Sequence, residues 1–431
     1  MFPFAAIAWL LVQALPYFLF DIFFWLIIIF INFQYKNMVK TEIQLFGTRR
    51  LSARRLTLMS TLIGMLAGFL GSFIMIVLGV SVSNTGFGFV WIVALALALI
   101  NVRFVCFAYA GGLVALFSLI FGIPQVAVPD LMALVAILHL MESILILVSG
   151  HHFALPVYVE HENSKNEDSK LVGGFSLQKF WPIPLIVLGA TIIPKPENMA
   201  QLITMPDWWP LIKPRVDLLP GQEYLYQMFP LVAALGYGDL SITSQPKQKS
   251  RKTALHLAGF SLLLLALAVA SSHFYPLCFL AALFAPIGHE LVIWYGLKSE
   301  WGGKPIYGKE DRGVKVLDVI ENTTAAQFGF NPGDLILRVN NQEVNTGFEL
   351  EEALRSAAGY LWFDVRDFQG NEKQYEGWYR EFELKKFGLL LAPEGGERFY
   401  MKIQKTPPWK VLWQKFRTRF FPGGMNKSGK I

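Results

Sequence analysis

Residues 313–346, GVKVLDVIENTTAAQFGFNPGDLILRVNNQEVNT, contain the most informative pattern in this 431-residue chain. Val314 and Val316 flank Lys315, which predicts a strand, and the Ala-bearing segment 324–328 predicts a short helix. An Asn-Pro-Gly-Asp turn at 331–334 is followed by a second apolar strand at 335–339. Asn340-Asn341 then predicts a tight turn, because Asn tolerates a positive φ better than most residues.

This order of elements resembles a PDZ domain, whose core is an apolar strand, a small-residue helix, Gly-Asp, a second strand and an Asn-Gly-type turn. Asn341 stands where Gly is commoner. The resemblance implies a small α+β domain over 299–400 that binds extended peptides by adding a strand to its own sheet. A helix at 348–357 and strands at 361–366 and near 379–385 are expected to complete it.

The peptide groove of a PDZ domain requires a free strand edge, a facing helix and a loop whose N–H groups hold a carboxylate. Bacterial PDZ domains are commonly circularly permuted, so this loop can follow the last strand. Here the Φ-Gly-Φ segment 387–389 leads into an apolar strand. A terminal strand with no binding role is the plainer alternative. The predicted peptide-contacting residues are Phe387, Gly388, Leu389, Leu390 and Leu391, with Leu350 and Leu354 four residues apart on the facing helix.

The remainder of the chain has the composition of a membrane protein. The chain is 54% apolar and only 16% charged, and a soluble protein of this length carries more charge. Apolar stretches of about 20 residues predict helical membrane spans. The predicted fold class is therefore mostly α, a polytopic bundle of transmembrane helices over 1–298, plus the small α+β domain. The eight or nine predicted spans are 13–33, 57–80, 87–101, 104–122, 128–149, 181–195, 225–240, 253–270 and 274–296.

Charge in the loops predicts the orientation. The loop 35–56 carries six Lys or Arg against Glu42 alone, and the loop 241–252 is also basic. The positive-inside rule places both loops in the cytoplasm, and counting spans forward places the PDZ-like domain there too. The first apolar run, 1–33, lacks a basic n-region and a small-residue cleavage site, so we expect it to be retained. The predicted location is the cell membrane, and the number of spans and the N-terminal orientation stay open.

The segment 401–431 is predicted to be a basic amphipathic tail. It contains eight Lys or Arg and no acidic residue. Apolar residues recur in it at helical spacing, which favours a helix lying on an anionic bilayer surface. A solvated tail without a fixed partner is the alternative. The apolar stripe consists of Trp409, Leu412, Trp413, Phe416 and Phe420.

Ionisable residues within membrane spans are candidates for function, because they are costly there. His139 and Glu142 share one helix face at spacing i, i+3. Gly288-His289-Glu290 resembles half of a His-Glu-x-x-His zinc motif, but the second histidine is replaced by Ile293. A split site from His139, Glu142 and His289 is conceivable, although nothing in the sequence brings them together. The full set is Asp21, Asp130, His139, Glu142, Asp239, His256, His289 and Glu290.

Other catalytic and binding motifs are missing from the sequence. Cys106 and Cys278 offer no disulfide framework and no zinc spacing, and both are expected to be small buried hydrophobes. No Gly-x-Ser-x-Gly element and no phosphate-binding loop occurs. No basic soluble domain with a nucleic-acid motif is present. These observations predict a protein that is not an enzyme and needs no metal or cofactor.

Many spans followed by one PDZ-like domain resemble the MinJ family of Gram-positive bacteria. The strings that carry the resemblance are 138–143 (LHLMES), 180–182 (FWP), 235–239 (LGYGD), 288–290 (GHE) and the PDZ core. The resemblance implies a cell-division adaptor that bridges a DivIVA-type scaffold and a MinCD-type inhibitor. Oligomers are possible. The alternatives are an intramembrane metalloprotease-like protein and a PDZ-regulated protease or transporter.

Overall fold

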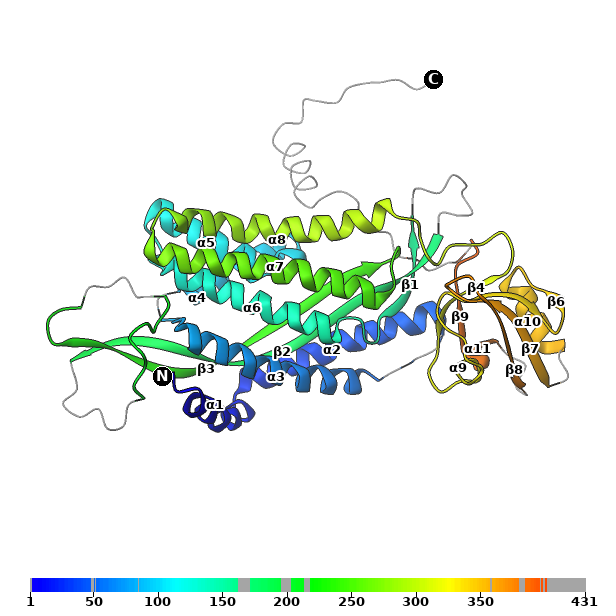
Figure 1. The fold of residues 1–431 in the computed structure, drawn as a ribbon, viewed down its shortest axis with the longest axis horizontal. Coiled ribbons are helices and arrows are strands. Elements are labelled where there is room, and N and C mark those ends of the chain that lie inside the picture. Colours follow the sequence, from blue (N-terminus) through cyan, green and yellow to red (C-terminus); the bar gives the residue numbers. More distant parts are fainter. Residues whose placement is uncertain are drawn as a thin grey trace, which may run out of the picture.

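The computed structural model of the chain is an elongated body of helices and one long β-hairpin, with a small α+β domain at one end (Figure 1). The predicted tail at 401–431 lies outside the described residues. The structure describes residues 2–47, 50, 52–83, 85–161, 171–194, 203–212, 218–356, 359–379, 384–395, 397 and 400.

Five helices in this part of the chain are long and apolar enough to cross a membrane. The shortest has 22 residues, which at about 1.5 Å per residue exceeds the ~30 Å apolar layer of a bilayer. They mark a multi-pass membrane protein, as the sequence predicted. The five are α2 (Ile22–Phe46), α3 (Ala53–Leu78), α6 (Val128–Ser149), α7 (Pro246–His273) and α8 (Leu277–Gly302).

The predicted first span, 13–33, is wrong in its boundaries, because the helix breaks at Asp21. The short helix α1 (Phe4–Leu19) ends before this residue, and α2 begins after it. The Asp21 carboxylate accepts a hydrogen bond from the Phe23 N–H at 2.7 Å. This is an N-cap, which explains the acidic residue in an apolar run.

The predicted spans 87–101 and 104–122 form two short helices, α4 (Phe87–Ile100) and α5 (Phe107–Phe121). They have 14 and 15 residues, and at about 1.5 Å per residue neither crosses the bilayer. Both lie toward the end of the bundle opposite the α+β domain (Figure 1). We therefore interpret them as a re-entrant pair, joined by residues 101–106 beside α6 and α8.

The predicted spans 181–195 and 225–240 are wrong, because these segments are strands. β2 (Leu171–Pro194) and β3 (Gln222–Ser241) pair antiparallel without interruption, and β1 (Leu155–Glu160) pairs with the start of β2. The hairpin runs between α3 on one side and α6 and α7 on the other (Figure 1). Because β2 is buried along most of its length, its sequence is a continuous apolar run that resembles a helical span.

Beyond its pairing with β1, the edge of β2 that faces away from β3 meets helices and a loop instead of another strand. Hydroxyl groups accept its outward N–H donors: Phe180 N–H bonds Tyr35 Oη at 3.2 Å, and Ile186 N–H bonds Ser72 Oγ at 2.8 Å. Ala190 N–H bonds Ser83 Oγ at 2.8 Å. At the alternate positions between Phe180 and Ile186 the residues are Pro182 and Pro184, which have no N–H.

Glycines in α3 let β2 approach the helix closely. A Cβ at Gly64 would lie 2.2 Å from the Pro182 carbonyl oxygen, and one at Gly68 would lie 2.1 Å from the Pro184 carbonyl oxygen. No real Cβ tolerates such distances. The two proline carbonyls therefore rest against bare helix backbone, where Cα–H groups are their nearest partners.

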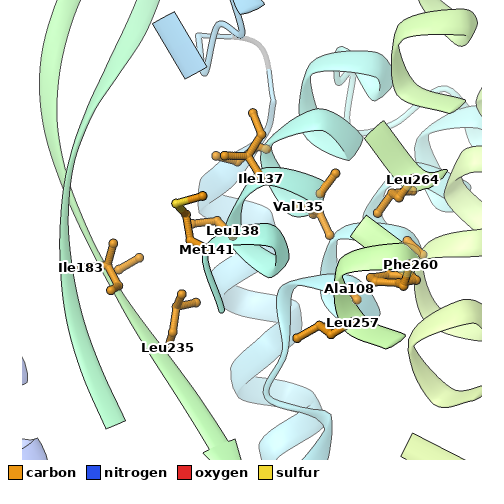
Figure 2. Close-up of a cluster of buried hydrophobic side chains, with 14 of the residues drawn as sticks. Ala108, Val135, Ile137, Leu138, Met141, Ile183, Leu235, Leu257, Phe260 and Leu264 are labelled. Atoms are coloured by element: carbon orange, nitrogen blue, oxygen red, sulfur yellow. The ribbon is translucent and has the colours of Figure 1, made fainter. Parts of the chain in front are cut away.

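Helix α6 forms the centre of the membrane part. Figure 2 shows Leu138 and Met141 of α6 directed toward Ile183 and Leu235 of the hairpin, while Val135 lies on the opposite side, where its Cγ2 is 3.0 Å from the position of a Cβ at Gly111 of α5. The side chains labelled in Figure 2 are 6% exposed or less. One apolar helix thus contacts the hairpin on one face and the other helices on the opposite face.

The C-terminal α+β domain has the predicted PDZ-like elements in the predicted order. The short helix α9 occupies Thr324–Phe328, and Asn340 and Asn341 have φ values of 48° and 68°. The strand predicted near 379–385 is wrong: the last hairpin strand is 372–378, and 384–387 form one helical turn. The elements are β4 (Val314–Val319), α9, β5 (Leu335–Val339), β6 (Gln342–Glu343), α10 (Gly347–Ser356), β7 (Tyr360–Arg366), β8 (Glu372–Trp378), α11 (Leu384–Phe387) and β9 (Leu389–Leu391).

Replacing Gly68 with alanine should destabilise the membrane part, because the new methyl group collides with backbone that cannot rotate away. We expect Gly68→Ala to cost about 1–3 kcal/mol, the usual range for overpacking, and to lower the thermal unfolding midpoint of the full chain in detergent. Gly259→Ala in α7 is the matched control, since a Cβ there meets nothing within 4 Å. Equal midpoints for the two variants would contradict the close packing of β2 on α3.

Candidate functional site

The strand β9 (Leu389–Leu391) lies at an edge of the domain's sheet. Among the described strands the order is β8-β7-β5-β4-β9, and β9 pairs only with β4. Gly388 C=O accepts from Ile320 N–H and Ala392 N–H donates to Lys315 C=O, both at 2.9 Å. Because backbone groups alternate along a strand, the N–H and C=O groups of Leu389 and Leu391 point away from β4. This edge can accept a peptide strand.

The turn that leads into β9 requires glycine. Gly388 has φ +95°, in the region that only glycine adopts freely. A Cβ at this position would also lie 2.1 Å from Thr323 Oγ1. Phe387, just before the turn, is fully buried in the domain core. The predicted Φ-Gly-Φ loop is therefore a rigid turn at the start of the free edge, while its role in holding a carboxylate stays a prediction.

Helix α10 faces this edge, although its two predicted contact residues do not line an open groove. Leu350 and Leu354 are both 0% exposed and belong to the same core cluster as Leu389. They attach α10 to the sheet. Both side chains are covered in this structure, and their direct contact with a peptide stays a prediction. At the N-terminus of α10, Gly347 N–H donates to the Glu394 carboxylate at 2.5 Å.

A tyrosine from the membrane part already occupies one position on the free edge. Tyr158 of β1 donates a hydrogen bond from its hydroxyl group to the outward C=O of Leu391 at 3.1 Å. Its ring packs edge-on against Phe46 of α2, with the centroids 5.3 Å apart. Burial raises the pKa of Tyr158, so the phenol stays protonated and remains a donor. An incoming strand that pairs with Leu391 must displace this hydroxyl group.

Arg50 joins the PDZ-like domain to the membrane part. Its guanidinium contacts Asp318 of β4 at 2.6 Å, Glu42 of α2 at 2.5 Å and the Ala154 carbonyl at 2.7 Å. Asp318 is 8% exposed. An arginine that contacts several acceptors in fixed directions holds the surfaces in one relative orientation.

Apolar contacts reinforce this junction. Tyr307, in the segment that leads into the domain, forms a β-bridge with Gly173 of β2 and packs on the Phe175 ring at 5.4 Å. Leu317 of β4 is 0% exposed and belongs to the main core of the membrane part. The free edge of β9 is consequently held at a defined place on the membrane part.

Most ionisable residues predicted inside spans have structural partners. Asp130, at the start of α6, accepts from Ser81 N–H at 3.0 Å. Asp239 lies in β3, not at a helix end, and contacts Thr253 Oγ1 at 2.7 Å and Lys249 Nζ at 3.4 Å. His256 packs on a tyrosine ring. Asp130, Asp239 and His256 thus connect neighbouring elements of the membrane part.

His139 and His289 behave differently, since the structure does bring them together. Their ring centroids are 5.0 Å apart, and both approach Cys106, which the sequence analysis treated as a buried hydrophobe. Glu290 is directed elsewhere, toward Arg103 at 2.8 Å and the Tyr109 hydroxyl at 2.5 Å. The sequence analysis grouped His139 and His289 in a conceivable split site, but it did not include Cys106.

Comparison with known proteins agrees with this geometry. A family model described as "PDZ domain" matches residues 304–359. The "Cell division topological determinant MinJ" of Bacillus subtilis (strain 168) is 25% identical over 229 residues, which cover 52% of this chain and 53% of that protein. The chain therefore resembles MinJ proteins over about half of its length and carries a PDZ domain. The "Probable cell division topological determinant MinJ" of Lacticaseibacillus paracasei is 29% identical over 97 residues, 22% of this chain and 26% of the relative.

These matches cover only part of each MinJ-like relative. The alignment spans about half of the Bacillus subtilis protein (53%) and about a quarter of the Lacticaseibacillus protein (26%). What the relatives' names say about cell division is therefore a starting point for a proposal about this chain.

Burial of Asp318 at the junction should make docking of the PDZ domain depend on pH. Burial raises the pKa of Asp318 from 3.8 to about 6, although the Arg50 guanidinium opposes the rise. The docked state therefore binds a proton more tightly than an undocked state in which Asp318 is exposed. Docking should weaken as the pH rises from about 4 to about 6, by roughly 100-fold for a shift of this size.

Energy transfer between fluorophores attached at the exposed positions Lys40 and Gln342 would measure this docking equilibrium. Asp318→Asn should remove the pH dependence and hold docking at its low-pH strength. Glu372→Gln, at an exposed site on β8, should leave the pH dependence unchanged. A variant Asp318→Asn that retained the full pH dependence would show that another group is responsible.

Proposed function

We propose that this MinJ-like protein is a non-enzymatic membrane adaptor that holds partner proteins at the division site through its PDZ domain. The observation that carries the proposal is the free edge of β9, which begins at the Gly388 turn and is held on a multi-pass membrane part. Strand addition to such an edge is how PDZ domains bind peptides. By family resemblance, the partners would be a DivIVA-type scaffold and a MinCD-type inhibitor.

The positions of the basic segments support a cytoplasmic PDZ domain. Helix α2 ends and α3 begins near Arg50, which contacts the domain directly. The other basic segment, 246–252, starts α7 beside the base of the hairpin. Both lie at the PDZ end of the bundle (Figure 1), and basic segments favour the cytoplasmic side.

The two alternative functions, protease and transporter, predict different effects of substitutions on activity. An intramembrane protease would cleave a substrate and lose that activity in His289→Ala, whereas an adaptor would still capture its partners. A transporter would show uptake that depends on Asp130, Glu142 or Asp239. Two of these acids already have structural bonds, which favours the adaptor.

Crosslinking in cells, followed by recovery of the tagged protein, tests the adaptor function. The full chain should recover division proteins that a chain truncated after Gly308 does not. This boundary keeps Glu300, which accepts from Ile242 and Thr243 N–H at 2.8 Å, and Tyr307, so these contacts of the membrane part are retained. Recovery of the same partners by both chains would place binding outside the PDZ domain.

A single substitution tests the edge itself. Gly388→Ala should reduce partner recovery at least tenfold, because the methyl group strains a positive φ, at about 1–2 kcal/mol, and collides with Thr323. Gly370→Ala is matched in backbone strain, with φ +93°, but lies in the distant β7–β8 turn where a Cβ meets nothing within 4 Å. Equal recovery by the two variants would contradict a binding role for the β9 edge.

A further inference from the structure

Three side chains with metal-binding atoms converge inside the helical bundle. Cys106 Sγ lies 3.1 Å from His139 Nε2 and 3.8 Å from His289 Nε2. All three atoms lie within 4.8 Å of one another. The residues come from the start of α5, the middle of α6 and the middle of α8, so tertiary packing alone assembles the cluster.

The re-entrant pair places the cysteine at this depth. Because α4 and α5 are too short to cross the bilayer, the connection 101–106 turns back within the bundle, beside the centres of α6 and α8. The ion pair between Arg103 and Glu290 anchors this turn to α8. Close packing anchors the helix that follows, since a Cβ at Gly112 would lie 2.6 Å from the Pro286 ring.

His139 is held as a metal ligand requires. Its Nδ1 lies 2.8 Å from the Val135 carbonyl oxygen, and a carbonyl can only accept, so Nδ1 carries the hydrogen. In the neutral ring, the lone pair of Nε2 is then directed at Cys106. A backbone carbonyl that fixes the tautomer in this way is the usual support for a histidine bound to a metal.

His289 presents its Nε2 to the same point in the bundle. The residue is 9% exposed, and its Nε2 lies 3.8 Å from Cys106 Sγ, which is too long for a strong hydrogen bond. A buried ring nitrogen without a strong partner is unfavourable. Coordination of a metal through Nε2 would give this nitrogen a strong partner.

We propose that Cys106, His139 and His289 bind one zinc ion or a similar borderline-soft divalent cation. Zinc takes Cys and His ligands at about 2.3 Å and about 2.0–2.1 Å, which sets tetrahedral separations of about 3.3 Å between two nitrogens and about 3.6 Å between sulfur and nitrogen. Two of the observed separations, 3.1 and 3.8 Å, are close to these values. On binding, the Cys106 thiol loses its proton to solvent and coordinates as the thiolate. The ion would join the re-entrant turn to α6 and α8 and leave one coordination position open.

Metal content of the purified full chain tests the site. After chelator treatment and removal of the chelator, the protein in detergent should take up one Zn²⁺ per chain. Zn²⁺ should also raise the thermal unfolding midpoint, because an ion that binds only the folded state stabilises it. Co²⁺ in place of Zn²⁺ should give a thiolate-to-cobalt charge-transfer absorption, which reports the cysteine ligand directly.

Cys106→Ser should abolish the thiolate band and weaken Zn²⁺ binding at least tenfold. His139→Gln and His289→Gln should weaken binding while keeping a thiolate band at high Co²⁺, so the proposal stays testable if one variant folds poorly. Cys278→Ser and His256→Gln are matched controls on α8 and α7, and both should bind as the native chain does. A native chain that binds no Zn²⁺ would overturn the proposal. So would binding that survives Cys106→Ser but is lost when His151 and His152, whose ring centroids lie 4.1 Å apart, are both replaced.

Discussion

The rest of this structure depends on burying one edge of β2 among apolar elements. A strand edge carries a row of N–H and C=O groups, and within a bilayer no water is available to bond them. The chain meets this constraint with hydroxyl groups from Tyr35, Ser72 and Ser83, and with two prolines that have no N–H to satisfy. Glycines on α3 then let the strand lie directly against the helix.

The hairpin also determines where the two ends of the molecule lie. Its base pairs with β1, which carries Tyr158, and bridges to Tyr307 before the PDZ domain. Its strands extend past the helices at the other end (Figure 1). The PDZ domain is therefore docked on the base of the hairpin, and one outward carbonyl of its free edge is bonded to that base. Ligand access to the edge and docking of the domain are physically linked.

Two of the predicted helical spans were wrong in kind, because 181–195 and 225–240 form a hairpin. The segments 87–101 and 104–122 are helices as predicted, but they have only 14 and 15 residues. Each of these two pairs of segments leaves and returns on the same side of the bundle. The side of the membrane that span counting predicts for the loops between the long helices is therefore unchanged. Hydropathy reports that a segment is buried in an apolar medium, and it does not distinguish a helix from a strand covered on both faces.

The sequence by itself determined the membrane character, the PDZ domain and the position of the Gly388 turn. These features depend on local signals: apolar runs, strand alternation, and residues that tolerate a positive φ. Only the tertiary structure showed that Leu350 and Leu354 are core residues and that Tyr158 caps the β9 edge. It alone joined Cys106, His139 and His289, which are separated by 33 and 150 residues in the chain. The physical reason is that burial and coordination depend on which surfaces pack together, and residue spacing within one element carries no information about neighbours from another.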